Sequence, residues 1–368
     1  QFYLEMKNYQ VSLAFNGVEG VEKAKQEVPD LILLDVVMPG IDGFETCRRL
    51  KQDPTTAKIP VLFLSSLTNT NDKIKGLESG GVDFISSTSD QPEILARIEA
   101  HLKISELTQK LQASNYELQL KQKALNEDLY AASIIQQSLL PPESFQKINR
   151  VSVAWLCQPS EQIGGDICNI IPFDSGKHIV VYILDVSGHG VHSAMVTVSM
   201  TQFLHQFQTV GSPLPPKDVL SILNKEYPFE KFNMFSTLFY LNLDTINGRM
   251  VYANAGHHSA VLLSPFESYK LLDSTGPMIG VESSSNFEEK EVTLQEGDKV
   301  FLFTDGIIEF RNNEGEFYGF ERFYQLLEDN KMETVNKIIE LVSFSLKEFG
   351  HGRPPQDDIS ILGFEFKK

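Results

Sequence analysis

The sequence predicts a multidomain protein in which an α/β domain, a long helix and a larger α+β domain follow one another. Its 368 residues exceed one typical domain. Residues 1–101 alternate short apolar runs with helical patterns, and residues 102–140 contain neither glycine nor proline. Residues 141–368 are rich in strand-like runs separated by turn signals. These boundaries define the three predicted segments.

The first segment predicts a doubly wound parallel sheet. The runs "VSLAF", "LILLDVV", "VLFLSS" and "VDFISS" are typical of strands. Between and after them, "GVEGVEKAKQEV", "GFETCRRLKQ", "DKIKGLES" and "PEILARIEAHL" have helical periodicity. Strands that alternate with helices in this way indicate parallel pairing.

The second segment predicts a coiled coil. One set of seam positions recurs every seventh residue, at Ile104, Leu111, Leu118, Leu125, Ala132 and Leu139. The other set is Leu107, Ser114, Lys121, Asp128 and Ile135. A seam with polar residues in its middle is typical of a dimeric coiled coil of modest stability. The alternative is a single amphipathic helix that packs on a neighbouring domain. Pro141 and Pro142 are expected to end the helix.

The third segment predicts a sheet-rich α+β domain. Strand-like runs include "HIVVYILDV", "STLFYLNLD", "RMVYANA", "SAVLLS" and "DKVFLFTD". Helical stretches are expected near 192–208 and 321–349.

Composition excludes several classes of function. The formal net charge of −17 opposes nucleic-acid binding, which needs a basic surface. No apolar run approaches the length of a membrane span, and no signal pattern opens the sequence. The three cysteines, Cys47, Cys157 and Cys168, fit neither a disulfide framework nor a zinc site. We therefore expect a cytoplasmic protein without nucleic-acid or membrane partners.

Four aspartate stretches carry the chemistry of the third segment. They are "GGDIC" with Asp166, "ILDVSGHG" with Asp185, "FLFTDGIIE" with Asp305, and "PPQDDISI" with Asp357 and Asp358. Carboxylates where apolar runs break suit hard divalent ions such as Mg²⁺ and Mn²⁺. Two such ions can activate a water and polarise a phosphoryl oxygen. Asp244 and Asp273 are expected to be ordinary turn residues.

A competing hypothesis makes Ser187 a nucleophile with His189 or His192. It needs a third group that orients the imidazole, and the sequence suggests none. His257 and His258 are expected to be loop or packing residues. Gly188 and Gly190 fit a tight turn that lets the backbone approach a metal.

In order, "EQIGGD", "LDVSGHGVHSAM", "TLFYLNLDTINGRMVYANAGHHSAVLL", "LQEGDKVFLFTDGIIEFRNNEGEFYG" and "QDDIS" strongly resemble the bacterial SpoIIE/RsbU-type PPM phosphatases. These are metal-dependent protein serine/threonine phosphatases related to protein phosphatase 2C. The resemblance covers about residues 129–366, including "IIQQSLLPP" at 134–142. It implies an α-β-β-α sandwich with two Mn²⁺ or Mg²⁺ ions at one edge.

The resemblance also implies roles for particular residues. Asp185 matches the carboxylate that bridges the two metals, and Val186 matches a backbone carbonyl ligand. Asp166 matches a ligand of one ion, and Asp305 and Asp357 match ligands of the other. Asp358 is a weaker candidate. Many members have an aspartate at the position of Asn169, so the role of that side chain is left open.

The run "LILLDVVMPGIDGFE" resembles the phosphoacceptor stretch of response-regulator receiver domains, over residues 1–101. Asp35 matches the phosphorylated aspartate, Ser65 the hydroxyl residue that senses the phosphoryl group, and Phe84 a switch aromatic. The acidic pair of the first receiver strand is absent from the sequence, and Ser87 stands where receivers carry a lysine. Asp35 is therefore either a phosphorylation site or a structural turn residue.

Together these features predict a receiver-regulated, metal-dependent serine phosphatase. By resemblance, its substrate is a phosphoserine on an anti-sigma-factor antagonist in a partner-switching pathway. An upstream histidine kinase and a homodimer through the coiled coil are the other expected partners. The alternative is a catalytically idle scaffold that binds a regulatory partner. The retained aspartates favour catalysis.

Overall fold

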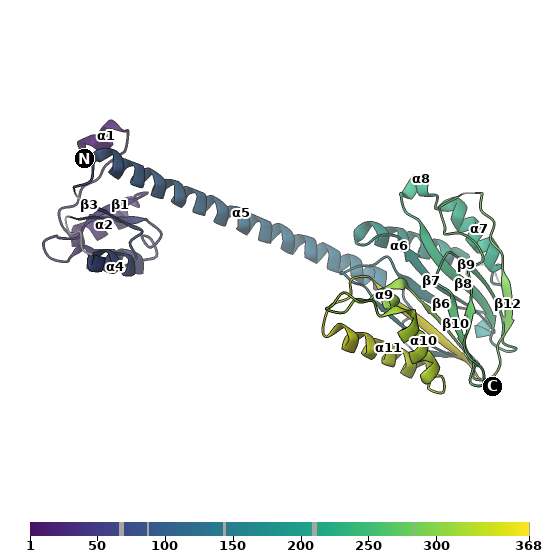
Figure 1. The fold of residues 1–368 in the computed structure, drawn as a ribbon. Coiled ribbons are helices and arrows are strands. Elements are labelled where there is room, and N and C mark those ends of the chain that lie inside the picture. Colours follow the sequence, from purple (N-terminus) through teal and green to yellow (C-terminus); the bar gives the residue numbers. More distant parts are fainter. Residues whose placement is uncertain (66–69, 87, 143–144, 208–211, 283, 368) are drawn as a thin grey trace. The chain divides into compact units, whose positions relative to one another are not determined.

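The structure is a computed structural model that describes residues 1–65, 70–86, 88–142, 145–207, 212–282 and 284–367. The chain divides into two compact units, Gln1–Lys123 and Ala124–Lys368. Each is described by itself (Figure 1).

The first unit contains a three-stranded parallel sheet in the order β1-β2-β3. Its strands are β1 (Ile32–Asp35), β2 (Val61–Ser65) and β3 (Asp83–Ser86). Its shorter helices are α1 (Phe2–Met6), α2 (Gly17–Glu27), α3 (Gly43–Gln52) and α4 (Thr70–Glu78). The α2 and α3 N-termini are capped by the side chains of Asn16 and Asp42. A parallel sheet with helices in its connections agrees with the predicted receiver domain.

One predicted strand of this unit is wrong. The run "VSLAF" at 11–15 forms no strand. A strand needs a neighbour to pair its backbone groups. Among the described residues, β1 has a strand neighbour on one side only, and that neighbour is β2. Among the described residues, the other edge of β1 stays unpaired and residues 11–15 do not add to it, although their residue types favour a strand.

The long helix α5 extends from Gln91 to Gln137 without interruption. The predicted receiver helix at 92–102 and the predicted linker helix are thus one element. Most of its apolar seam side chains are exposed, with exposed fractions of 56% at Ile104, 62% at Leu111 and 60% at Leu118. Leu139, just after the helix, is buried in the core of the second unit. The segment boundaries at 101 and 140 stay predictions.

The second unit is a sandwich of two antiparallel sheets with helices on both outer faces (Figure 1). One sheet has six strands, in the order β11 (Lys270–Leu272), β10 (Ala260–Leu263), β13 (Lys299–Phe303), β14 (Ile359–Phe366), β5 (Val151–Gln158) and β4 (Phe145–Ile148). The other has five, in the order β12 (Lys290–Thr293), β9 (Arg249–Ala255), β8 (Ser236–Asp244), β7 (His178–Val186) and β6 (Ile167–Phe173). This arrangement confirms the predicted α-β-β-α sandwich.

The unbroken apolar run of β7 follows from burial on both of its faces. Ile179, Val181 and Ile183 lie in the core between the sheets. Val180 and Tyr182 face the opposite way, into a second core shared with α6 (Val191–Gln206) and α7 (Pro216–Glu226). Side chains alternate between the faces of a strand, so a central strand covered on both faces is largely apolar along its buried length, residues 179–184.

The other outer face is covered by α10 (Gly319–Asp329) and α11 (Val335–Gly350). The prediction of a single helical stretch at 321–349 is therefore wrong at its middle, where Thr334 caps α11 with its side chain. The remaining short helices are α8 (Phe229–Phe232), α9 (Asp305–Ile308) and the 3₁₀ turn η1 (Asp174–Gly176). No described helix is long and apolar enough to cross a membrane.

Candidate metal centre

Two predicted ligands lie at strand ends on opposite sheets of the sandwich. Asp185 is the penultimate residue of β7 and pairs with Thr237 of β8 in the five-stranded sheet. Asp305 begins α9, just after β13 of the six-stranded sheet. Asp166 immediately precedes β6, and Asp357 lies shortly before β14. The fold thus gathers acids from 166 to 357 at one end of the two sheets.

The pKa values of these four acids are all raised, and repulsion by neighbouring acids contributes at Asp166, Asp185 and Asp357. Burial, followed by the charges of Asp305, Asp357 and Asp358, raises the pKa of Asp185 to about 7. Burial, followed by the charge of Asp185, also raises the pKa of Asp166. Burial is likewise the main cause of the raised pKa values of Asp305 and Asp357. Crowded, partly buried carboxylates need a proton or a cation to be stable.

The described side chains do not form a closed ligand set. Among them, no three Asp, Glu, His or Cys side chains converge in the arrangement of a metal site. The donor set still fits hard divalent ions, because it consists of carboxylate oxygens and one backbone carbonyl. That carbonyl belongs to Val186, and an added Cβ at Gly165 would lie only 2.6 Å from its oxygen. Gly165 therefore leaves the carbonyl the room that a side chain would fill.

Asp166 is held by a hydroxyl group. Thr304 Oγ1 donates to Asp166 Oδ2 at 2.7 Å, and both side chains are buried. Thr304 N in turn donates to Ser360 O. Thr304 directly precedes Asp305, so one residue links the positions of two predicted ligands.

Asp358 bonds to the backbone of residues 160–166, here called the glycine loop. Its Oδ1 accepts from Ser160 N at 2.8 Å and from Ser160 Oγ at 3.0 Å. Its Oδ2 accepts from Gly165 N at 2.6 Å. A Cβ at Gly164 would lie 2.3 Å from that oxygen, so the approach requires glycine there. With its oxygens engaged in this way, Asp358 positions the loop that carries Asp166.

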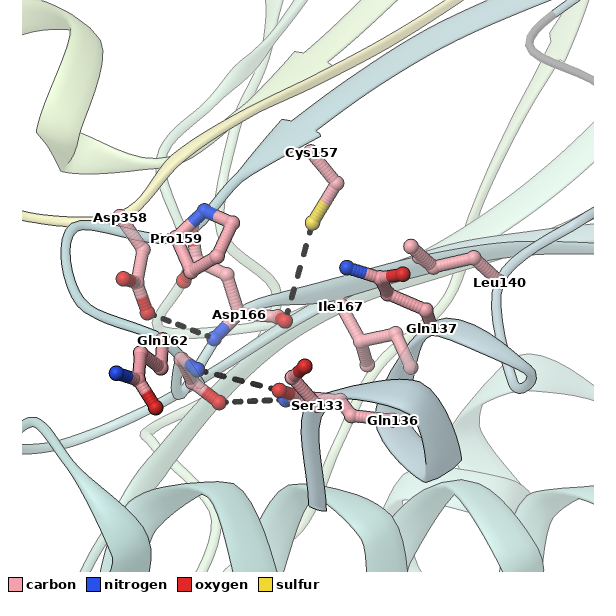
Figure 2. Close-up of a pocket in the computed structure, with 11 residues that line it drawn as sticks. Ser133, Gln136, Gln137, Leu140, Cys157, Pro159, Gln162, Asp166, Ile167 and Asp358 are labelled. Carbon is pink, nitrogen blue, oxygen red and sulfur yellow. Dashed lines mark hydrogen bonds between the residues drawn. The ribbon is translucent and has the colours of Figure 1, made fainter. Parts of the chain in front are cut away.

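A second contact holds the glycine loop from the end of α5. Gln136 Nε2 donates to Gly164 O at 2.6 Å, and Gly164 N donates to Gln136 Oε1 at 3.2 Å. Gln136 and Asp358 both line a pocket beside Asp166 (Figure 2). The long helix therefore contacts the loop that ends at a predicted ligand.

Asn169 has a structural role that an aspartate lacks. Its Nδ2 donates to Leu139 O at 2.7 Å and lies 3.2 Å from His205 Nε2. Burial lowers the pKa of His205, so the ring offers a lone pair to the amide. A carboxylate has no hydrogen to donate to Leu139. The asparagine thus fixes the turn after α5.

The serine nucleophile hypothesis gains no support from the geometry. Ser187 Oγ accepts from Phe235 N at 3.1 Å. His189 is exposed and lies 3.6 Å from Glu161, while His192 is exposed on α6. Gly188 and Gly190 have φ values of 87° and 83°, as the tight turn requires. Asp244 accepts from Ile246 N in a turn at the other end of β8.

The predicted receiver residues lie on three adjacent parallel strands. Asp35 ends β1 and is exposed, Ser65 ends β2, and Phe84 lies in β3 and packs on Phe63. Asp35 Oδ1 accepts from Val37 N at 3.1 Å. The carboxyl ends of such strands are where doubly wound sheets carry reactive groups. Ser87 lies outside the described residues.

The family comparisons agree with this geometry. The family model described as "Stage II sporulation protein E (SpoIIE)" matches residues 175–367, and the response regulator receiver domain model matches residues 1–99. The chain therefore belongs to the SpoIIE phosphatase family and has a receiver domain at its N-terminal end.

Solved structures share the fold of the second unit. The SiaA-PP2C domain of Pseudomonas aeruginosa has a TM-score of 0.59 at 23% identity and covers 67% of this chain and 99% of its own. The RsbU and RsbW domains of Rv1364c from Mycobacterium tuberculosis have a TM-score of 0.51 at 21% identity. The match covers 60% of this chain and 61% of the Rv1364c chain.

Curated relatives match the receiver. Response regulator PleD of Caulobacter vibrioides is 44% identical over 111 residues, which are 29% of this chain and 24% of PleD. The transcriptional regulator RpaA of Synechocystis is 46% identical over 100 residues, 27% of this chain and 42% of RpaA. The chain thus spans less than half the length of these relatives.

The raised pKa of Asp185 predicts a pH dependence of the metal-free protein. Between pH 3.8 and about 7 the unfolded chain loses this proton while the folded protein keeps it. The free energy of unfolding therefore falls as the pH rises through that window. In EDTA, we expect the melting temperature of the wild type to fall between pH 5 and pH 8. This fall should be several degrees larger than the fall of Asp185→Asn over the same range. An equal change of melting temperature with pH in the two proteins would contradict the crowding of the acids.

The bonds of Asp358 predict that it positions ligands without being one. Asp358→Asn turns an amide N–H toward Gly165 N, which costs about 1–3 kcal/mol for unsatisfied donors. We expect Mn²⁺ to bind about tenfold more weakly by calorimetry, at unchanged stoichiometry. Ser160→Ala, which removes one hydroxyl, is expected to have a smaller effect in the same direction. A loss of one Mn²⁺ per chain, as expected for Asp357→Asn, would make Asp358 a ligand instead.

Proposed function

We propose that this protein is a metal-dependent protein serine/threonine phosphatase whose activity is set by its receiver domain. Membership of the phosphatase family and the attached receiver define a regulated phosphatase. The observation that supports metal dependence is the crowding of Asp166, Asp185, Asp305 and Asp357, whose pKa values are all raised.

In this proposal, Asp185 would be the ligand shared by two Mn²⁺ or Mg²⁺ ions. Val186 would contribute its carbonyl, Asp166 would hold one ion, and Asp305 and Asp357 would hold the other. Bound ions of this kind supply an activated water and polarise a phosphoryl oxygen. The two sheets fix the spacing of the acids. A serine nucleophile would be unnecessary, because an activated water could replace it.

The substrate is proposed to be a phosphoserine protein of the anti-sigma-factor-antagonist class. This assignment follows the family resemblance. The cytoplasm stays the predicted compartment.

We propose that α5 transmits the state of the receiver as part of a homodimer. Its exposed apolar seam, which includes Ile104, Leu111, Leu118 and Leu125, is suited to a second copy of the chain. Leu107 and Ile135 of the other seam positions are exposed as well. Light scattering that gives the mass of one chain at every concentration would contradict the dimer.

The contact between Gln136 and Gly164 supports a route from α5 to the ligands. A helix that shifts in the dimer moves Gln136, and with it the glycine loop before Asp166. The loop then has two arrangements, one with loose and one with assembled ligands, and packing of the linker biases their populations. Phosphorylation of Asp35 by a histidine kinase is the proposed input.

Hydrolysis of a phosphoserine peptide by the full chain tests the enzyme. We expect activity with Mn²⁺, no activity in EDTA, and a loss of about 100-fold or more in Asp185→Asn, because bound metal supplies several kcal/mol. Asp244→Asn, at the other end of the sheet, is the matched control and is expected to keep activity. A full chain that binds Mn²⁺ without hydrolysing the peptide would favour the idle scaffold, unless the unit Ala124–Lys368 alone is active.

The helix contact is tested by Gln136→Leu. Loss of two hydrogen bonds to Gly164 is expected to lower activity about tenfold at limiting Mn²⁺. An exposed glutamine elsewhere on α5 provides the control, since Gln119→Leu is expected to act like the wild type. Equal activity of the two variants would show that this contact does not carry regulation.

A further inference from the structure

His257 lies directly behind the bridging aspartate, in a part of the site for which metal binding gives no account. It is the first histidine of the motif "NAGHH", and its side chain is only 5% exposed. Buried histidines that make two side-chain hydrogen bonds hold specific neighbours in place.

One nitrogen of His257 reaches the sheet that carries Asp185. His257 Nδ1 lies 2.7 Å from Thr237 Oγ1. Thr237 is the ladder partner of Asp185, and its Oγ1 lies 3.5 Å from Asp185 Oδ2. His257 is thus linked through one hydroxyl to the carboxylate between the proposed metals.

The other nitrogen reaches the opposite sheet. His257 Nε2 lies 3.0 Å from the carbonyl oxygen of Phe303, the last residue of β13. Two residues later the chain reaches Asp305. A carbonyl oxygen only accepts, so Nε2 carries the hydrogen of this bond. One ring therefore connects the ends of β8 and β13, which belong to different sheets.

The protonation of the ring sets the direction of the Thr237 hydroxyl. Burial lowers the pKa of His257 to about 3, so the ring is neutral and its Nδ1 accepts. Thr237 then donates its only hydrogen to His257 Nδ1, at 2.7 Å, in preference to the more distant Asp185 Oδ2, at 3.5 Å.

The backbone of the motif explains how the ring reaches this place. Asn254 Oδ1 accepts from His257 N at 2.8 Å, and Asn254 Nδ2 donates to His257 O at 3.0 Å. Gly256 has a φ of 63°, and a Cβ there would lie 2.6 Å from Met278 Cγ. In "NAGH", the asparagine thus holds the turn through hydrogen bonds and the glycine permits its backbone conformation. The histidine bridges the two sheets.

We propose that His257 is a positioning residue that sets the spacing of Asp185 and Asp305 by bridging Thr237 of one sheet to Phe303 of the other. The inference rests on the proposed two-metal function, because spacing matters only if the two aspartates share metal ions. Residues that orient ligands through hydrogen bonds typically contribute 10–100-fold to metal affinity or activity.

The test is calorimetric Mn²⁺ binding and phosphoserine hydrolysis by the full chain, with melting temperature as the check on folding. His257→Phe keeps the ring volume and removes both hydrogen bonds. Thr237→Val removes the hydroxyl at constant shape, and Thr237→Ser restores it. We expect Mn²⁺ to bind about 10-fold to 100-fold more weakly in His257→Phe and in Thr237→Val, and Thr237→Ser to bind like the wild type.

The double variant separates a shared bridge from two independent effects. If both residues act in one bridge, Thr237→Val adds little to the loss already caused by His257→Phe. Wild-type Mn²⁺ affinity in Thr237→Val, or equal weakening in Thr237→Ser and Thr237→Val, would overturn the inference.

Failure of the function and failure of the inference have different signatures. A wild type that binds Mn²⁺ but does not hydrolyse the peptide refutes the proposed function, and weaker binding by the variants would still support the bridge. A wild type that hydrolyses the peptide, with variants that bind Mn²⁺ equally well, refutes the bridge alone. A wild type that binds no Mn²⁺ refutes both.

Discussion

Repulsion among clustered carboxylates is the constraint on which the second unit depends. Asp166, Asp185, Asp305 and Asp357 come from distant parts of the sequence, and each has a raised pKa. Left without protons or cations, such groups push strand ends apart. Two sheets with three apolar cores oppose that force and hold the acids at one end of the sandwich. The packed sandwich therefore holds acids together that repel one another at its edge.

Neutral groups hold the acids in position. Thr304 bonds to Asp166, and His257 bridges the sheets behind Asp185 through Thr237. The buried carboxylate of Asp358 accepts backbone N–H groups of the glycine loop. Gln136 bonds to the same loop, so a change at the end of α5 would reach the residues next to Asp166. The proposed regulation would therefore act through the hydrogen bonds between Gln136 and the glycine loop.

Much of the fold was predictable because the sandwich strands are long and apolar. The expected runs at 178–186, 236–244 and 249–255 coincide with β7, β8 and β9. The strand at 11–15 was wrongly predicted because strand formation depends on a partner that local residue types do not reveal. The break between α10 and α11 was missed, although Thr334 is a good N-cap. Helix α7 was missed as well, although Pro216 is a favourable first helical residue.

The site was predictable to the extent that its chemistry lies in aspartates at the ends of apolar runs. The hydrogen bonds of Asp358, Asn169, Gln136 and His257 were not predictable, because each joins residues far apart in the sequence. His257 was expected to be a packing or loop residue, and its two ring contacts give it a more specific place. Only the three-dimensional arrangement distinguishes a histidine between two sheets from a histidine in a turn.

The most direct test is the anomalous scattering of manganese in a crystal of the full chain grown with MnCl₂. The account predicts two manganese peaks about 4 Å apart, as in other two-metal sites, with Asp185 between them and Asp358 turned toward the glycine loop. A single manganese, or no manganese within bonding distance of Asp185, would contradict it.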